Sequence, residues 1–346
     1  MSNVKIIVIT LVKDEAWMLD RFLATCSVFA DHIIVSDEST GLDSSLEIYK
    51  KYPKVTLHHN SGAPVRGDIR RKFVFDEARK ISCDKRIIIA IDSDEILSAN
   101  LLHSPEWQTV LAAEPGTLFH LQWVSLWKNC NYYRVEAKYQ FGGYNRQIWI
   151  DDGVSEIPAI GYQEMHMAYN PLHARTHVYL NEIVCLHYQY CNWERMESKH
   201  RYYRAHEKAD IGKLSDIAIY RIYGHAHSRK IEVKPSLSCW FDGWISRGID
   251  MTSTARDELT HFDISVLRLF ESHGAGFFLN QDLWKVDWEY LTNRAKELGL
   301  LSADFKYTRP PKTIRSRLFH AYMKTAFDVK ILKSVEKRLF PKGRVY

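Results

Sequence analysis

The twelve residues from Arg86 to Leu97 constrain the fold more than any other part of the sequence. They begin with a short, continuous apolar run, which is typical of a strand buried on both faces of a parallel sheet. Asp92, Asp94 and Glu95 follow within four positions. Three carboxylates at the carboxyl end of a buried strand would repel one another unless a cation lay among them. Such oxygen ligands favour Mg²⁺ or Mn²⁺, whereas an isolated Asp-x-Asp is more often an acidic, solvated turn, so the preceding residues must decide.

Three units of strand followed by helix precede this stretch. The first two strands are short apolar runs, the third strand is short, and the first helix carries apolar residues at helical spacing. This alternation predicts an α/β fold with a doubly wound, mostly parallel sheet and right-handed crossovers. The predicted strands are Lys5–Leu11, His32–Ser36 and Val55–His58, and the predicted helices are Glu15–Phe29, Ser44–Tyr52 and Asp68–Ser82.

Four motifs at the ends of these elements occur in an order that resembles the family 2 glycosyltransferases of the GT-A fold. They are Val12-Lys-Asp-Glu15, Ile33-Ile-Val-Ser-Asp37-Glu-Ser-Thr40, Arg70-Arg71 and Ile89-Ala-Ile-Asp92-Ser-Asp94-Glu95. The resemblance covers residues 4–100 well and extends more loosely to about residue 210, with Leu186-His187-Tyr188 similar to the end of the catalytic domain in bacterial members. The family commonly has Asn-Glu and Asp-Asp-Gly-Ser where this chain has Asp14-Glu15 and Asp37-Glu-Ser-Thr, and both changes keep a carboxylate.

The resemblance implies a metal-dependent, inverting transfer of a sugar from a UDP- or GDP-linked donor to a glycan or a lipid-linked glycan. Such a reaction requires charge neutralisation on the departing diphosphate, recognition of the nucleotide and a base for the acceptor hydroxyl. In the implied roles, Asp94, Asp92 and His187 hold Mn²⁺ or Mg²⁺; Thr10, Glu15, Asp37, Arg70, Arg71 and Asp92 bind the nucleotide sugar; and Glu164 is the base, with Asp151, Asp152 and Glu156 as competitors and His166 as a partner. The structural alternatives are a satisfied core histidine for His187 and a solvated helix start for the arginine pair.

Three other functions compete with this interpretation. Asp92-Ser-Asp94 also suggests a haloacid-dehalogenase-type phosphatase, with Asp92 as nucleophile and Asp151-Asp152 on Mg²⁺, but that family places its nucleophile on the first strand. A degenerate, non-enzymatic adaptor that binds sugar or nucleotide at the membrane is disfavoured because Asp37, both acids of the Asp-x-Asp motif and the arginine pair are all present. A nucleic-acid binder is disfavoured because the positive charge is confined to the tail.

Beyond Leu97 the sequence predicts further helices and strands, followed by a helical region. Lys128–Gly161 is rich in aromatic side chains and has few regular signals, as acceptor-binding loops do, apart from a strand-like Arg146–Ile150. From about Ser228 the apolar residues are spread among helical segments with no clear strand. The predicted elements are a helix at Asn100–Ala112, strands at Thr117–Trp127 and Glu182–His187 and a charged helix at Asn192–Ala209, and the predicted domains are a transferase domain over residues 1–227, a helical accessory region over 228–305 and a basic tail over 306–346.

The net charge of +5 is distributed unevenly along the chain. Between Lys306 and Tyr346, twelve Lys or Arg stand against Asp328 and Glu336, which gives a local charge of +10 and leaves −5 for the preceding 305 residues. Apolar residues recur at near-helical spacing among these cations from Lys312 onward. Such a basic amphipathic helix either lies on an anionic membrane surface, at about 1 kcal/mol per basic residue near it, or docks on its own domain.

Cysteine usage and the first strand bear on the cellular compartment. The six cysteines are scattered without a Cys-x-x-Cys pair, which indicates neither a zinc site nor a disulfide framework and fits a reducing compartment. The apolar opening Val4–Val12 is too short to span a membrane and lacks the basic flank and cleavage site of a signal peptide. We therefore expect a cytoplasmic protein, with the tail as its route to peripheral association with the inner face of the membrane.

Overall fold

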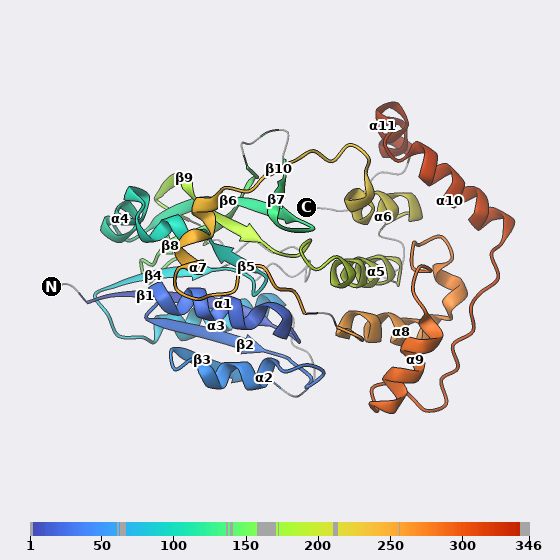
Figure 1. The fold of residues 1–346 in the computed structure, drawn as a ribbon, viewed down its shortest axis with the longest axis horizontal. Coiled ribbons are helices and arrows are strands. Elements are labelled where there is room, and N and C mark those ends of the chain that lie inside the picture. The colour runs from blue at the N-terminus through green and yellow to red at the C-terminus, as the bar shows by residue number, and fades with distance from the viewer. Residues whose placement is uncertain are drawn as a thin grey trace. The chain divides into compact units, whose positions relative to one another are not determined.

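The computed structural model describes residues 3–60, 62, 67–135, 138, 141–157, 171, 173–209, 214–255 and 257–339, and Figure 1 shows the fold. The chain divides into two compact units. The sheet unit comprises Met1–Asn192 and Val233–Ala255, and the helical unit comprises Trp193–Glu232 and Arg256–Tyr346. The three domains expected at residues 1–227, 228–305 and 306–346 were defined by their expected roles, so they do not coincide with these two units and stay a prediction.

The first four strands form the parallel part of the sheet. In the order β3-β2-β1-β4 every neighbouring pair is parallel, and the register places Val8 opposite Ile33 on one side and Ile89 on the other. The α/β class and the strand-helix alternation are therefore confirmed, while the assignment to the GT-A fold stays a prediction. The bounds are β1 Val4–Val12, β2 His32–Asp37, β3 Val55–His59 and β4 Lys85–Ala90.

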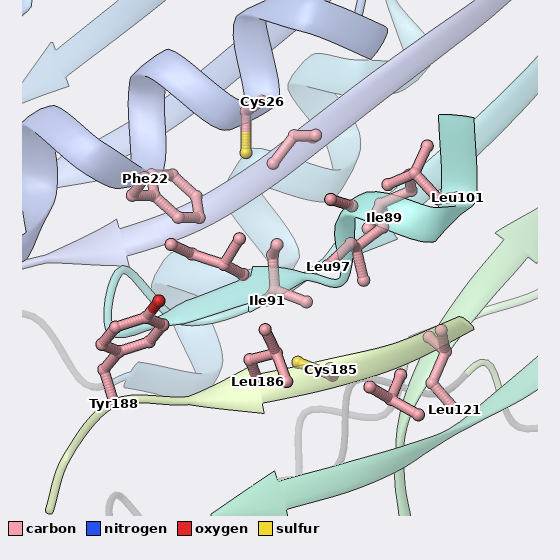
Figure 2. Close-up of a cluster of buried hydrophobic side chains, with 14 of the residues drawn as sticks. Phe22, Cys26, Ile89, Ile91, Leu97, Leu101, Leu121, Cys185, Leu186 and Tyr188 are labelled. Atoms are coloured by element: carbon pink, nitrogen blue, oxygen red, sulfur yellow. The ribbon is translucent and has the colours of Figure 1, made fainter. Parts of the chain in front are cut away.

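Helices α1 and α3 cover opposite faces of these strands. Successive strand residues point to opposite faces, so Val8 joins an apolar cluster with the side chains of α1, and Ile7 joins a second cluster with those of α3. Figure 2 shows Phe22 and Cys26 pointing from α1 into the first cluster, where both are buried. Burial on both faces explains why β1, β2 and β4 contain continuous apolar runs, whereas the edge strand β3 is half exposed and contains two histidines. The bounds are α1 Ala16–Phe29 and α3 Gly67–Arg79.

The remaining strands extend the sheet from β4 in a mixed arrangement. β8 runs antiparallel to β4, β6 antiparallel to β8, and β9 parallel to β6. β5 pairs with the end of β9, and β7 and β10 lie at the outer edge. The start of β8 and the end of β9 therefore lie at the same edge as the end of β4. The bounds are β5 Glu95–Leu97, β6 Thr117–Trp127, β7 Asn129–Arg134, β8 Tyr144–Ile150, β9 Thr176–His187 and β10 Val233–Pro235.

Two strands and one helix depart from the sequence predictions. The expectation of no strand beyond Ser228 is wrong, because β10 lies there. β10 is an edge strand, and it tolerates Pro235 because an edge strand needs fewer amide donors. Its partner β7 was also not expected.

The helix expected at Asn100–Ala112 is a 3₁₀ turn followed by a separate helix. The break occurs because the Ser104 hydroxyl accepts the Glu106 backbone N–H at 3.1 Å and caps a new start. The bounds are Ala99–Leu102 for the turn and Pro105–Ala112 for α4.

The helical unit contains the packed pair α5 and α8. Arg201 of α5 pairs with Asp263 of α8 at 2.9 Å, and the Ser198 hydroxyl lies 2.7 Å from that of Thr260. The charged helix expected from Asn192 is α5. Within the described ranges, no helix is both long enough and apolar enough to cross a bilayer. The bounds are α5 Trp193–Ala209, α6 Asp216–Tyr223, α8 His261–His273, α9 Trp288–Glu297, α10 Ile314–Ala326 and α11 Lys330–Leu339, with α2 Ser45–Ile48 and α7 Asp242–Ile245 in the sheet unit.

His200 is a buried imidazole on α5. Its ring packs near Tyr223 and His225, with centroid distances of 6.1 and 5.5 Å. Burial, reinforced by the neighbouring His225 and Arg204, lowers the pKa of His200 from its ordinary 6.5 to about 2. Between these values the unfolded chain binds a proton that the folded chain does not. His200 therefore costs the fold nothing above about pH 6.5 and destabilises it progressively as the pH falls from there.

Replacing His200 with Gln removes this titration. We expect the wild-type chain to lose stability relative to His200→Gln by up to about 1.4 kcal/mol per pH unit between about pH 6 and pH 4. The urea denaturation midpoints of both proteins, compared at several pH values from neutral downward, measure this difference. A difference in stability between the two proteins that stays constant with pH would contradict this expectation, because it would show that His200 binds its proton equally well in the folded and the unfolded chain.

Candidate active site

The loops that follow β1, β2 and β4 meet at one edge of the sheet, because parallel strands end on the same side. Asp37 ends β2, and Asp92 and Asp94 follow β4. His187 is the last residue of β9, and it reaches this edge because it pairs with Glu95 across β5 and β9. We call this side of the sheet unit the acidic edge.

Asp94 and His187 face each other at buried positions on the acidic edge. His187 Nε2 lies 3.4 Å from Asp94 Oδ2, and the Tyr188 backbone N–H donates to the Asp94 carbonyl at 2.9 Å. The Trp123 indole stacks on the imidazole, with ring centroids 4.3 Å apart. One ligand atom from each of Asp94, Glu95 and His187 lies within 4.8 Å of the other two. This buried cluster of two carboxylates and an imidazole could bind a metal ion.

Glu95 is fully buried, and its two oxygens meet four donor groups. Oε1 accepts from Trp123 Nε1 at 2.6 Å and lies 2.5 Å from Arg146 Nη2. Oε2 accepts from Arg146 Nε at 2.6 Å and from the Asp92 backbone N–H at 3.0 Å. Burial raises the pKa of Glu95 above its usual range, and the Arg146 guanidinium opposes that rise. Because four donors already occupy its acceptor positions, Glu95 serves this site chiefly as the anchor for Arg146.

Arg146 brings a positively charged side chain to the acidic edge. It lies near the start of β8, which runs antiparallel to β4 and so begins where β4 ends. Its guanidinium bridges Glu95 and Asp92, with Nη2 3.0 Å from Asp92 Oδ2, and lies 5.0 Å from the Trp123 ring centroid. Arg146 and Trp123 were not expected at the site. The available signal for Arg146 was a cation opening an apolar, strand-like run.

Of the three residues in this cluster, Asp94 and His187 fit a divalent cation better than Glu95, whose acceptor positions are already filled. Two ligands at right angles on an ion with bonds of about 2.1 Å lie about 3 Å apart, close to the 3.4 Å between His187 Nε2 and Asp94 Oδ2. His187 Nδ1 is buried, and none of the described residues gives it a hydrogen-bond partner, so the tautomer depends on what Nε2 binds. A donor set of carboxylate and imidazole suits Mn²⁺ well, whereas Mg²⁺ prefers oxygen alone.

The residues expected to contact the nucleotide base and ribose lie along β1 and β2. Asp37 is fully buried, and its carboxylate accepts hydrogen bonds from the Ser39 backbone N–H and the Tyr49 hydroxyl. Thr10 is also buried, and its hydroxyl has no hydrogen-bond partner in the described part of the chain. Glu15 immediately precedes α1 and accepts an indole N–H at 2.5 Å. These three side chains lie at or near the ends of the two strands, whose carboxyl ends form part of the acidic edge.

Arg70 and Arg71, adjacent on α3, have different surroundings. Arg70 donates to the Ser36 carbonyl at 2.6 Å and pairs with Glu38 at 3.1 Å, so it ties α3 to the end of β2. Arg71 lies 3.9 Å from the Asp92 carboxylate. Of the two guanidinium groups, Arg71 is therefore the one directed at the Asp-x-Asp motif, while Arg70 supports the strand ends.

Asp151 and Asp152 lie at the other end of β4 from the acidic edge. Because β8 runs antiparallel to β4, the residue that follows β8 lies beside Arg86 at the start of β4. The Asp151 carboxylate is buried between Arg79 and Arg86, each 2.8 Å away, and Asp152 accepts the Ser155 hydroxyl at 2.7 Å. The structure therefore does not bring these two acids to the Asp-x-Asp motif. The phosphatase alternative needs both acid pairs in one site, so this geometry disfavours it.

The other candidates for the base lie elsewhere in the sequence. Glu164, the expected base, and His166, its expected partner, fall outside the described residues. Glu156 is exposed and follows Asp152 in the loop after β8. The identity of the base therefore stays a prediction.

The pair of Glu95 and Arg146 gives a direct test of this geometry. Arg146→Met leaves the Glu95 charge buried without its main partner, so we expect the free energy of unfolding to fall by about 3–5 kcal/mol. Glu95→Gln in the same background removes that charge, and the double variant should then be more stable than Arg146→Met alone. Urea unfolding of the wild type, both single variants and the double variant measures the coupling, and strictly additive effects would contradict it.

Neither the protein-family profiles nor the curated proteins include a match to this sequence. Solved structures include distant likenesses. A nucleotidyl transferase from Methanothermobacter thermautotroptrophicus is 15% identical, with a TM-score of 0.23 over 37% of this chain and 67% of its own. The apo form of the glycosyltransferase GlyE from Streptococcus pneumoniae TIGR4 is 12% identical, with a TM-score of 0.24 over 99% of this chain and 66% of its own. The chain thus spans slightly less than two thirds of GlyE, and TM-scores this low carry no conclusion about fold or function.

Proposed function

We propose that the sheet unit is a metal-dependent, inverting glycosyltransferase, which moves a sugar from a UDP- or GDP-linked donor to a glycan or lipid-linked glycan. The observation that carries the proposal is the buried pair of Asp94 and His187, which lies with Asp92 at the carboxyl edge of parallel strands. Open α/β sheets bind their ligands at this edge. The order of the four sequence motifs supports a nucleotide sugar as the ligand class.

Asp94, His187 and Asp92 are the residues that would hold Mn²⁺ or Mg²⁺. When bound, the cation neutralises negative charge on the departing nucleotide diphosphate. Arg146 and Arg71 lie 3.0 and 3.9 Å from the Asp92 carboxylate. The Nε and Nη2 groups of Arg146 are bonded to Glu95 and Asp92, so Arg146 would hold Asp92 in position. A planar guanidinium orients phosphate oxygens through paired N–H donors, and Arg71 would play that role toward the diphosphate.

Asp37, Glu15 and Thr10 are assigned to the base and ribose of the nucleotide. The Tyr49 hydroxyl donates to the Asp37 carboxylate and limits its orientation. Burial, together with the Asp37 charge, raises the pKa of Tyr49 well above its usual range, so this hydroxyl stays protonated and remains a donor. Arg70 supports these residues by holding the end of β2.

Glu164 is assigned as the base that takes the proton of the acceptor hydroxyl. The assignment rests on the resemblance to family 2 glycosyltransferases and on the positions of its competitors. Asp151 is buried between two arginines, and Asp152 lies beside it at the opposite end of β4. Neither acid lies at the acidic edge, where the acceptor hydroxyl would have to be activated.

Asp94→Ala tests the metal site. We expect the wild-type chain to bind UDP or GDP in isothermal calorimetry with Mn²⁺ or Mg²⁺ and to lose that binding in EDTA, and we expect Asp94→Ala to abolish it even with metal. Asp76→Ala is the matched control, because Asp76 is a half-exposed acid of the same unit that pairs with Lys72 at 2.6 Å on α3. Equal binding in metal and in EDTA would contradict the metal role.

Glu164→Gln tests the base separately from donor binding. We expect donor affinity to be retained while sugar transfer falls by about 10²- to 10⁴-fold, because the amide cannot take a proton. Asp151→Asn is the comparison: it should lower the free energy of unfolding by about 3–5 kcal/mol by breaking a buried ion pair, and leave transfer by the folded fraction intact. Undiminished transfer by Glu164→Gln would show that Glu164 is not the base.

A further inference from the structure

Helices α10 and α11, the last two drawn in Figure 1, each expose a row of apolar side chains. The row on α10 consists of Ile314, Leu318 and Tyr322, with exposed fractions of 78, 66 and 37%. The row on α11 consists of Ile331, Val335 and Leu339, with exposed fractions of 76, 45 and 68%. A spacing of four residues places each row along one side of its helix. Two successive rows of this kind differ from the single apolar residues that are scattered over ordinary surfaces.

Other sides of these helices attach them to the helical unit. On α10, Ser316 and Met323 are buried, and they lie on roughly the opposite side of the helix from Leu318. On α11, Glu336 is buried, and its Oε1 lies 2.7 Å from Arg221 Nη2. Tyr322 belongs to both sets, because its hydroxyl donates to Glu336 Oε1 at 2.6 Å. The tail is therefore docked through these side chains while Ile314, Leu318, Ile331 and Leu339 stay exposed, so docking on its own domain and binding to a membrane surface are not mutually exclusive.

Among the described residues of these two helices, the exposed charged side chains are all cations. The two acids of the segment are turned to internal partners: Asp328 accepts the Ser228 hydroxyl at 2.6 Å, and Glu336 pairs with Arg221. The exposed cations are Arg315, Arg317, Lys324, Lys330, Lys333 and Arg338. We call the two apolar rows and these cations the tail face.

We propose that the tail face binds an anionic membrane surface. The apolar rows would enter the boundary between head groups and acyl chains, and the cations would lie among negatively charged head groups. Charge complementarity favours this occupant over a second copy of the chain, because the cations of two tail faces would repel each other. A bilayer that contains anionic lipid offers one face both the apolar layer and the negative charge. The inference holds whichever reaction the sheet unit catalyses.

Vesicle flotation of the full chain tests the proposal. We expect the protein to float with vesicles of equal parts phosphatidylglycerol and phosphatidylcholine, and to stay in the soluble fraction with phosphatidylcholine alone. About 0.5 M salt should weaken flotation, because it screens the charges of the head groups. Equal flotation with both kinds of vesicle, or flotation with neither, would overturn the proposal.

Two triple variants separate the apolar and the charged contributions, and all six positions are exposed, so the fold should be retained. Each variant should lower the fraction bound to anionic vesicles by more than about tenfold. The apolar variant is Leu318→Gln, Ile331→Gln and Leu339→Gln, and the charge variant is Arg317→Glu, Lys330→Glu and Arg338→Glu. The matched control is Lys50→Glu, Lys51→Glu and Lys80→Glu, which makes the same change in net charge on the sheet unit and should bind as the wild type does.

The oligomeric state identifies the competing occupant. Light scattering of the wild-type chain without lipid should give the mass of a monomer. A dimer that dissociates in the apolar variant would assign the tail face to a second copy of the chain and overturn the proposal. Loss of vesicle binding in the control variant, equal to the loss in the charge variant, would show attraction by net charge alone and would also overturn it.

Discussion

The acidic edge depends on one buried ion pair, between Glu95 and Arg146. Glu95 is completely enclosed, and an enclosed carboxylate is costly unless its charge is paired and its oxygens are hydrogen-bonded. Arg146 supplies that charge from β8, the Trp123 indole supplies a donor from β6, and the Asp92 backbone supplies another from the turn after β4. Elements far apart in the sequence are thus fixed around a single side chain, which gives the loop after β4 its form.

The same pair sets the charge of the site. Asp92, Asp94 and Glu95 bring three negative charges to the acidic edge, and Arg146 and Arg71 bring two positive ones. One formal negative charge remains, which is enough to attract a cation but too little to hold a divalent ion without help. A site with this balance of charge would gain from an anionic ligand that shares the ion, and diphosphates are ligands of that kind. Asp94 and His187, whose Oδ2 and Nε2 atoms lie 3.4 Å apart, are the residues that would share the ion with such a ligand.

The sequence predicted those features that depend on local pattern. Burial of a strand on both faces shows in the strand's own residues, so β1, β2 and β4 and the position of Asp92 and Asp94 after β4 could be predicted. Arg146 could not be predicted as a partner of Glu95, because the two are 51 residues apart and meet only through the register of antiparallel strands. The same register carries Asp151 to the opposite end of β4. This could not be predicted either, because the sequence does not show whether the strand before an acid runs parallel or antiparallel to its neighbour.

The sheet unit is completed by a segment from much later in the chain. Val233–Ala255 belongs to this unit, adds β10 to the sheet and contributes Trp244, which is fully buried and donates its indole N–H to the Leu97 carbonyl at 3.0 Å. A fragment that stops at Asn192 would therefore leave part of its own apolar core open to water. The shortest polypeptide that keeps the sheet unit whole is one in which Asn192 is joined to Val233, so the two units cannot be separated by a single cut.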